Sequence, residues 1–373
     1  MNPTTPGPEA PRAAEPVRVH MTGSAWFGTA PGGLNRYFTD LYTALRSRPD
    51  AEVSAVAFGR PARGGQTWGA PDGSTLRRAC ASLRDDASLP STAVIDRHFS
   101  LYGRARTSRR GRHPLVVHFH GPWAAESRVA GAGDLTAAAK YWLERARYAG
   151  ADRFVVLSRH FAELLSEQYH VPSGLVRVIP PGVDLTRFHA TDPPRPTPMV
   201  LCVRRLERRM GVDVLIQAWR AVTADHPEAR LVVVGTGTQA ADLRAQAAAS
   251  GVGDRITFAG EVDDDELAEL YAQAALTVVP SVSLEGFGLA ALESLAAGRA
   301  PVVTDCGGLP DSVQHLDASL VVPAGDAEAL GDRIVRALEG QVPGTRACRA
   351  HAESFSWEAA ASRHVAMYRE LVS

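Results

Sequence analysis

Two glutamates, Glu285 and Glu293, stand eight positions apart in the segment SLEGFGLAALESLAAG, and a Gly-Phe-Gly turn follows the first of them. The apolar run LTVVP before this segment predicts a β-strand, and LAALESLAAG is typical of a helix. Glu285 is therefore expected on the loop between strand and helix. Glu293 is expected about two turns into the helix.

The backbone between the two glutamates has the features of a phosphate site. The first N–H groups of a helix have no partner within the helix and lie at the positive end of its dipole. Glycines in the turn would let the backbone approach a ligand closely. These donors belong to Gly286, Phe287, Gly288 and Leu289.

Carboxylates flank this predicted phosphate site. Glu293 can accept hydrogen bonds from the vicinal hydroxyls of a ribose, as acidic residues do in dinucleotide-binding folds. Glu285 faces the other side of the phosphates, where a sugar would lie. The segment therefore fits a sugar, a diphosphate and a ribose in turn. A capped helix with a solvated Glu293 and a turn-stabilising Glu285 is the alternative, over which the preceding strand and the glycine turn favour the site.

The elements that must position this segment recur along the whole chain. Short apolar runs such as VRVHM, LVVHFH, MVLCV and RLVVVG alternate with helical stretches. Continuous runs of this kind are typical of parallel strands that helices cover on both faces. We predict an α/β fold with two doubly wound domains that face each other across a cleft. Ligands bind such sheets beyond the carboxyl ends of the strands.

The domain boundary is expected in the proline-rich stretch HATDPPRPTP, residues 189–198. We predict the first domain over residues 16–190 and the second over residues 191–355, after a disordered leader over residues 1–15. The last helix, expected over residues 356–373, has apolar positions at helical spacing. It is predicted to pack back on the first domain.

Composition narrows the class of partner. The net charge of −1 over 373 residues lacks the basic excess that a nucleic-acid partner calls for. Four widely spaced cysteines fit reduced thiols and a cytoplasmic location. The one basic run, RARTSRRGRH, is expected to be a solvated helix end, with contact to anionic lipid as the less favoured alternative. The sequence leaves the oligomeric state open.

A resemblance adds to this interpretation. The spacing E-G-F-G-L-x-x-L-E, followed by A-x-G-x-x-P-V-V, resembles the retaining GT-B glycosyltransferases of family 4, over most of the chain from Val17 onward. The resemblance implies two Rossmann-like domains and transfer of a sugar from a nucleotide-sugar to an acceptor hydroxyl, with no metal and no further cofactor. It assigns Glu285 to the donor sugar, Glu293 to the ribose and the Phe287–Leu289 amides to the diphosphate.

One departure from the family pattern lies in the loop VRRLERRMG. The family pattern R-L-x-x-x-K-G places an arginine and a lysine on the diphosphate. Arg205 stands at the arginine position, but Met210 stands at the lysine position and cannot neutralise a phosphate. Because guanidinium groups suit phosphate oxygens, we expect Arg209 to supply the second cation. A solvated basic loop is the alternative.

The first domain is expected to contribute a facing wall. Gly32 and Gly33 precede a helix after the first strand and form a second glycine-rich helix N-terminus. His120 ends the strand LVVHFH and resembles the family's active-site histidine beside the transferred sugar. His118 is expected to be a buried histidine of the core. Two histidines without a third ligand do not predict a metal site.

Loops of the second domain complete the predicted donor site. Gly235 in VGTGT and Val262 in FAGEV follow strands, and the family contacts the nucleobase through the second of these loops. The residue types do not separate uracil from guanine, and UDP is expected ahead of GDP. A third glycine of the dinucleotide fingerprint is absent, which argues against a nicotinamide enzyme. Arg159 and Asp184 are outer candidates, for which a helix cap and a Pro-Gly turn are adequate explanations.

The expected function is a retaining hexosyltransferase, by analogy in bacterial secondary-metabolite or glycoconjugate biosynthesis. Because no carboxylate nucleophile is clear, we expect the diphosphate to depart from the face that the acceptor attacks. A nucleotide-sugar epimerase is one alternative and would need an acid and a base around the sugar. A non-catalytic nucleotide-sugar-binding protein is another, which Met210 favours. The catalytic candidates are His120, Glu285, Arg205 and Arg209.

Overall fold

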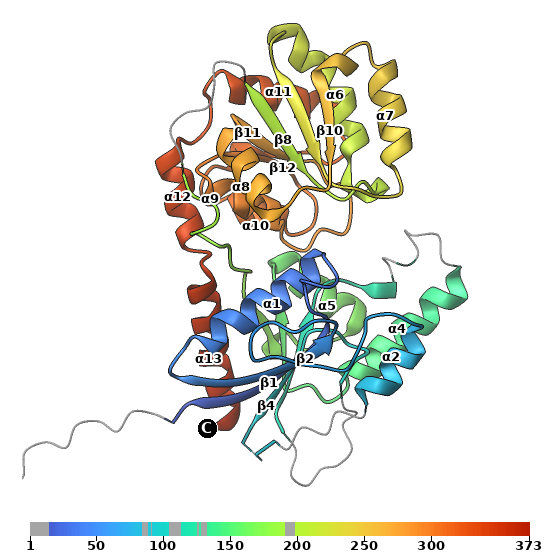
Figure 1. Cartoon of the computed structure of the whole chain (residues 1–373), viewed down its shortest axis with the longest axis vertical. Helices are drawn as coiled ribbons and strands as arrows, with labels where there is room; N and C mark the ends of the chain where they lie inside the picture. The colour runs from blue at the N-terminus through green and yellow to red at the C-terminus, as the bar shows by residue number, and fades with distance from the viewer. Residues whose placement is uncertain are drawn as a thin grey trace, which may run out of the picture.

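The computed structural model describes residues 15–83, 89–90, 92–103, 113–124, 127, 133–190 and 198–373. Nearly all of the predicted leader, most of the proline-rich boundary and nearly all of the basic run RARTSRRGRH lie outside these residues. Figure 1 shows two domains stacked along the long axis of the molecule, with the first below the second.

The first domain is built on a seven-stranded parallel sheet in the order β3-β2-β1-β4-β5-β6-β7. The strands are β1 (Val17–Ala25), β2 (Ala51–Phe58), β3 (Gln66–Thr67), β4 (Val94–Arg97), β5 (Leu115–Phe119), β6 (Arg153–Val156) and β7 (Val176–Val178). The helices are α1 (Gly33–Arg46), α2 (Thr75–Ser82), α4 (Asp134–Tyr148), α5 (Arg159–Tyr169) and the 3-10 turn η1 (Ser173–Leu175). Because β1 neighbours both β2 and β4, the chain changes direction across the sheet there, and loops after these strands open a crevice.

The second domain has a six-stranded parallel sheet in the order β10-β9-β8-β11-β12-β13. The strands are β8 (Met199–Val203), β9 (Arg230–Val234), β10 (Ile256–Gly260), β11 (Leu276–Val279), β12 (Pro301–Thr304) and β13 (Val321–Val322). The helices are α6 (Val212–Asp225), α7 (Ala240–Ala249), α8 (Asp264–Gln273), α9 (Leu289–Ala296), α10 (Leu309–Val313), α11 (Ala327–Leu338) and α12 (Thr345–Glu353). The 3-10 turns are η2 (Arg208–Met210), η3 (Gly253–Arg255) and η4 (Ala318–Leu320).

The central strands have the character that their sequences predicted. Every residue of β5, β11 and β12 is buried. Strands of a parallel sheet lose both faces to covering helices, which is why these runs are apolar throughout rather than alternating. The prediction of two doubly wound α/β domains is confirmed.

The last helix, α13 (Trp357–Val372), lies against the first domain. Its Ala361, Val365 and Tyr368 join the core that contains Tyr37 and Leu41 of α1. Figure 1 shows α12 and α13 following one another down one side of the molecule, from the second domain to the first. None of the helices in the described part of the chain has the length and apolar character that crossing a bilayer requires.

Candidate functional site

The loop between β11 and α9 is held in a strained conformation. Leu284 has a φ of 55°, which is uncommon for a residue with a side chain, and Gly288 has a φ of 90° just before α9 begins. A Cβ on Gly288 would collide with the side chain of Leu309. Glycine at 288 therefore satisfies both the backbone angle and the packing. Strain of this kind gathers at functional sites.

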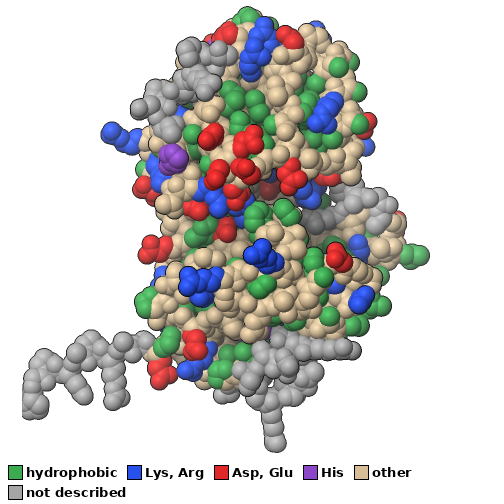
Figure 2. Space-filling view, viewed as in Figure 1, with side chains coloured by type: hydrophobic (Ala, Val, Ile, Leu, Met, Phe, Trp, Pro, Cys, Tyr) green, Lys and Arg blue, Asp and Glu red, His purple; other side chains and the backbone are tan. Residues whose placement is uncertain are grey.

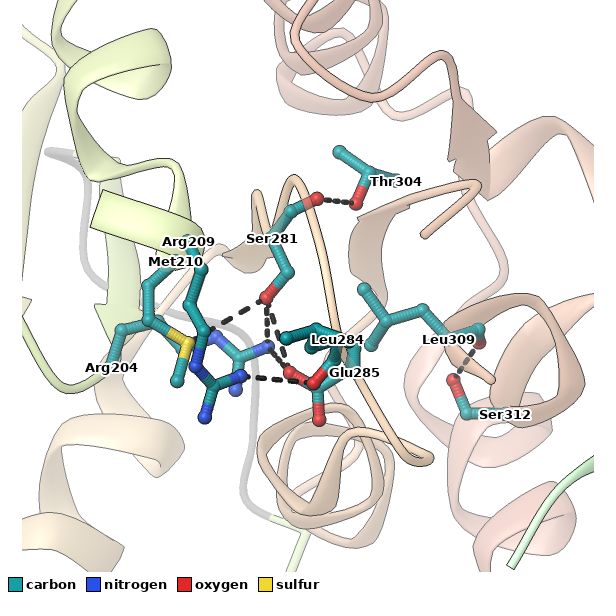
Figure 3. Close-up of polar contacts among 9 residues, drawn as sticks. All are labelled: Arg204, Arg209, Met210, Ser281, Leu284, Glu285, Thr304, Leu309 and Ser312. Atoms are coloured by element: carbon teal, nitrogen blue, oxygen red, sulfur yellow. Dashed lines mark hydrogen bonds and ion pairs between the residues drawn. The ribbon is translucent and has the colours of Figure 1, made fainter. Parts of the chain in front are cut away.

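Glu285 is fixed at the centre of this loop. Arg204 Nη2 donates a hydrogen bond of 2.5 Å to Glu285 Oε2 and one of 2.6 Å to Ser281 Oγ. The Ser281 hydroxyl in turn donates to Glu285 Oε2 at 3.1 Å. The Arg204 and Glu285 side chains are 9% and 14% exposed, so this ion pair is largely shielded from water. Figure 3 shows the side chains of Arg204, Ser281 and Glu285 converging.

A second pair of glycines supports Glu285 from behind. The backbone N–H of Gly308 donates to the Glu285 carbonyl at 2.9 Å. A Cβ on Gly307 would collide with that carbonyl, and one on Gly308 would collide with the carbonyl of Gly286. The loop before α10 therefore packs backbone to backbone against the Glu285 loop. This packing explains why the segment CGGLP, residues 306–310, has glycine at positions 307 and 308.

The arginines predicted for the diphosphate take different positions. Arg205 is exposed at the end of β8. Arg209 Nη1 donates to the Leu284 carbonyl at 2.9 Å, and its own carbonyl accepts from the Val282 N–H at 2.9 Å. Arg209 therefore braces the Glu285 loop, and its contact with a diphosphate stays a prediction. Met210 is buried, and its sulfur lies 3.9 Å from Ser281 Oγ.

The glycine-rich start of α1 meets the start of α9. Gly32 is the residue before α1, and the helix begins at Gly33. A Cβ placed on Gly33 would lie 3.9 Å from Leu289 Cδ1. The two helix N-termini thus approach one another from opposite domains. Figure 1 shows α1 along the edge of the first domain that faces the second.

His120 follows β5 and is half-buried against Tyr37, with ring centroids 5.1 Å apart. Burial, and then the neighbouring His118 and His98, hold its pKa well below the usual range. The ring is therefore neutral at physiological pH. Its Nε2 atom is buried and has no hydrogen-bond partner among the residues that the structure describes.

Behind His120 lies a buried cluster of polar side chains, of which the sequence predicted only His118. Asp96 Oδ1 lies 2.9 Å from His118 Nε2, and Asp96 Oδ2 lies 3.2 Å from His98 Nε2. Tyr368 of α13 donates to Asp96 Oδ2 at 2.6 Å. Burial lowers the pKa of His118 to about 4. Burial alone would raise the pKa of Asp96, but His118 and His98 outweigh it and hold that pKa well below the usual range.

The pattern that indicated His120, a histidine at the carboxyl end of a strand, also applies to His98. It is the first residue after β4, so it stands at the carboxyl end of a neighbouring strand. Nitrogens of His98, His118 and His120 lie within 4.8 Å of one another, a spacing that could serve a metal ion. However, the Nε2 atoms of His98 and His118 both already face the Asp96 carboxylate, and the two rings stack with centroids 3.8 Å apart. The absence of a metal from the site stays a prediction.

Glu293 lines a cavity between the domains together with Leu289, Arg36, Asp40 and other residues. Tyr271 donates to Glu293 Oε2 at 2.8 Å, and burial raises the pKa of the glutamate. Burial also raises the pKa of Asp40 to about 6, against the lowering effect of the nearby Arg36. Glu293, the residue predicted to bind the ribose, therefore lies at the domain boundary. Because α9 begins at Leu289, Glu293 is about one helix turn along it and not the two turns that the sequence predicted.

Polar links join the domains on two sides of this region. Arg36 Nη2 lies 2.6 Å from Asp264 Oδ1, and Arg187 Nη1 lies 3.0 Å from Asp264 Oδ2. Arg159 donates to Asp311 through its backbone N–H at 2.9 Å and through Nη2 at 3.0 Å. Figure 2 shows acidic side chains gathered over α8, where the domains meet.

The remaining predicted residues lie around these contacts. Asp184 accepts from the N–H groups of Thr186 and Arg187, so its carboxylate stabilises a turn. Gly235 follows β9, with its N–H donating to Gly260 at 2.7 Å and no room for a Cβ beneath the Arg204 carbonyl. Val262 is half-buried after β10 and packs on the core of the second domain.

Two families of known proteins match the chain. The family described as "Glycosyl transferases group 1" matches residues 186–355, and "Glycosyltransferase Family 4" matches residues 31–187. A D-inositol 3-phosphate glycosyltransferase of Acidothermus cellulolyticus is 32% identical over 98% of this chain and 92% of its own length. A GDP-mannose-dependent alpha-(1-6)-phosphatidylinositol monomannoside mannosyltransferase of Mycobacterium tuberculosis is 33% identical over 45% of this chain and 48% of its own.

Solved structures share the fold. A sucrose-phosphate synthase from Thermosynechococcus elongatus superposes with a TM-score of 0.75 and 23% identity, over 95% of this chain and 99% of that chain. At this identity the likeness concerns the arrangement of the two domains.

Proposed function

Because the chain belongs to the group 1 glycosyltransferases and has their two-domain GT-B fold, we propose that it transfers the sugar of a UDP-sugar to an acceptor hydroxyl with retention of the anomeric configuration. The observation that carries this proposal is the position of Glu285. Its carboxylate is held by Arg204 and Ser281 just ahead of α9, where a helix N-terminus meets the glycine-rich start of α1. That arrangement suits a sugar next to a diphosphate.

In the proposed reaction, the bond between the anomeric carbon and a β-phosphate oxygen breaks, and its electron pair stays with the departing diphosphate. The acceptor oxygen bonds to the same face of that carbon, and its proton passes to a β-phosphate oxygen. The N–H groups at the start of α9, Arg205 and a second arginine of the segment 204–209 would stabilise the developing negative charge. We propose metal independence because these groups supply the neutralisation.

Glu285 and His120 would act on the sugar itself. The Glu285 carboxylate can accept hydrogen bonds from the sugar hydroxyls. His120 is neutral and carries a buried nitrogen without a partner in the described part of the chain, so it can bond to the sugar without adding charge. Glu293 would accept from the ribose at the domain boundary.

For the acceptor we propose a small polyol phosphate. The relative that matches along almost the whole chain is named for D-inositol 3-phosphate. A role in secondary-metabolite or glycoconjugate biosynthesis, in a bacterial cytoplasm, follows by analogy only and belongs to the same proposal.

The proposal is tested by incubating the protein with UDP-sugars or GDP-sugars and D-inositol 3-phosphate, and by mass spectrometry of the products. We expect a UDP-sugar to give a glycosylated acceptor, and NMR of the new bond to show the configuration of the donor. The variant Glu285→Gln is the control and should give little product. Interconversion of sugars without acceptor would support the epimerase instead. Tight donor binding without turnover on any acceptor would support a binding protein.

A further inference from the structure

The donor site contains a cation that the family pattern does not place there. Arg204 is the first residue after β8, and its guanidinium reaches Ser281 and Glu285 on the opposite loop. Its side chain is 9% exposed. A buried guanidinium is expensive unless a negative group is beside it, and Glu285 supplies that group.

Arg204 and Met210 meet at the same hydroxyl. Arg204 Nη2 lies 2.6 Å from Ser281 Oγ, and Met210 Sδ lies 3.9 Å from the same oxygen. The guanidinium of Arg204 therefore lies beside the end of the side chain at position 210. Figure 3 shows the guanidinium and the methionine sulfur on the same side of Ser281.

The guanidinium also has a donor to spare. Arg204 Nε is buried and has no hydrogen-bond partner within the residues that the structure describes. A buried N–H without an acceptor is destabilising, and a ligand oxygen can satisfy it. The planar guanidinium group of arginine matches the geometry of phosphate and carboxylate groups and can bind either through two parallel hydrogen bonds.

Arg209 is engaged differently. Its guanidinium donates to the Leu284 carbonyl at 2.9 Å and so holds the backbone of the loop. The two arginines therefore divide two tasks, with Arg209 bracing the backbone and Arg204 placing a positive charge beside the carboxylate.

We propose that Arg204 is the second cation of the diphosphate site and takes the place of the lysine that Met210 has replaced. This assignment rests on the proposed function, since it requires a nucleoside-diphosphate donor. In the complex, Arg204 contacts a β-phosphate oxygen while Glu285 contacts the sugar. When the bond to the anomeric carbon breaks, the charge that stays on the β-phosphate lies next to the guanidinium.

The test compares binding of UDP with binding of UMP by calorimetry, because the two ligands differ only in the β-phosphate. GDP and GMP replace them if the wild-type protein prefers guanosine. In Arg204→Gln, we expect UDP affinity to fall roughly ten- to hundredfold, as the loss of a charge-assisted hydrogen bond implies, while UMP affinity stays the same. The exposed Arg220 on α6 provides the control, and Arg220→Gln should leave both affinities unchanged.

A double variant that removes the cation at position 204 and adds one at position 210 tests the assignment more directly. In Arg204→Gln with Met210→Lys, the lysine can reach the vacated position, and we expect most of the UDP affinity to return. Met210→Lys alone places two cations at one hydroxyl and should gain nothing. Arg204→Lys keeps a charge and should retain more UDP affinity than Arg204→Gln, which separates charge loss from a folding defect.

A UDP-to-UMP affinity ratio that is unchanged in a folded Arg204→Gln protein would overturn the assignment, even if transfer activity fell. Arg204 would then act only by positioning Glu285. Failure of the wild-type protein to bind either diphosphate would overturn the proposed function, and this assignment with it. The two failures are therefore distinguishable.

Discussion

The two domains contribute walls of different chemical character to the candidate site. The wall from the second domain is a charged loop, in which Arg204, Glu285 and Ser281 bond to one another ahead of α9. The wall from the first domain is a stack of buried rings around His120 and Asp96. In the proposed reaction, a departing diphosphate needs fixed charges and donors on one side, and the neutral ring of His120 on the other suits the sugar.

This difference also shows in what holds each wall in place. The charged wall depends on close packing at glycines, because a Cβ on Gly288 would meet the Leu309 side chain and one on Gly308 would meet the Gly286 carbonyl. The ring wall depends on a long-range contact, since Tyr368 and His364 reach it from α13. Each wall should therefore fail in its own way when its support is removed.

The largest expected effect belongs to the carboxylate of the charged wall. In Glu285→Gln, we expect kcat to fall roughly a hundredfold or more, because the amide holds the sugar hydroxyls less well in the transition state. UDP affinity should stay the same or rise, since Arg204 loses its anionic partner. Steady-state kinetics and calorimetry give the two values. Glu269→Gln on the exposed face of α8 is the control, and equal losses in both variants would contradict the assignment.

The glycine packing of the same wall is tested by two matched substitutions. Gly288→Ala meets both a positive φ of 90° and the Leu309 side chain, whereas Gly251→Ala meets a φ of 79° in open space. We expect Gly288→Ala to destabilise the protein by about 2–4 kcal/mol and to weaken donor binding. Gly251→Ala should cost about 1–2 kcal/mol and leave donor binding intact. Thermal unfolding with and without UDP distinguishes them, and similar behaviour of the two variants would argue against tight packing at 288.

The ring wall predicts a loss of stability in acid. Burial lowers the pKa of His118 and of His364 to about 4 in the folded protein, against about 6.5 in the unfolded chain. The unfolded rings therefore bind protons first, and stability falls as the pH falls from about 6.5 to about 4, by on the order of 3 kcal/mol for each ring. Below that window, Asp96 adds to the loss because its folded pKa is also lowered.

Replacing one ring isolates this contribution. We expect His364→Phe to lower the melting temperature at pH 7 but to flatten its fall between pH 6.5 and pH 4, because one titrating ring is gone. His226→Phe is the control, since that histidine pairs with Glu228 near the surface. A pH profile that His364→Phe leaves parallel to the wild type would show that the cluster does not control acid stability.

The smallest effect is expected at the link between the walls. The Asp264 side chain is 41% exposed and keeps Arg187 as a partner when Arg36 is lost, so the ion pair with Arg36 contributes little stability. Arg36→Gln should change the melting temperature by no more than a degree or two and KM for the donor by no more than about threefold. Arg18→Gln, which breaks an exposed pair within the first domain, is the reference. A large rise in KM would indicate that this link sets the domain arrangement.

The sequence predicted the charged wall far better than the ring wall, for a physical reason. Glu285, the glycine turn and the start of α9 are contiguous, so strand, loop and helix signals fall in one window. Asp96, His118 and His364 come from three distant elements, and nothing in local periodicity indicates that they meet. The alternation of apolar runs with helical stretches was enough to predict the fold. Strands of a parallel sheet are buried on both faces, so their sequences are apolar throughout.

The spacing of the arginines alone does not determine which of them reaches Glu285. Three further arginines follow it within the next five positions, and spacing from the family pattern favoured Arg209 as the second cation. Only the path of the backbone after β8 determines which guanidinium reaches Ser281. Gly235 packs against that path, and a Cβ at this position would collide with the Arg204 carbonyl.

A crystal structure of the protein with UDP would show where the diphosphate binds. We predict that the β-phosphate lies between the two glycine-rich helix starts, with oxygens within hydrogen-bond distance of a backbone N–H at residues 287–289 and of an arginine from the loop after β8. A diphosphate found elsewhere, with the residue 287–289 amides and the Arg204–Glu285 pair untouched, would contradict it.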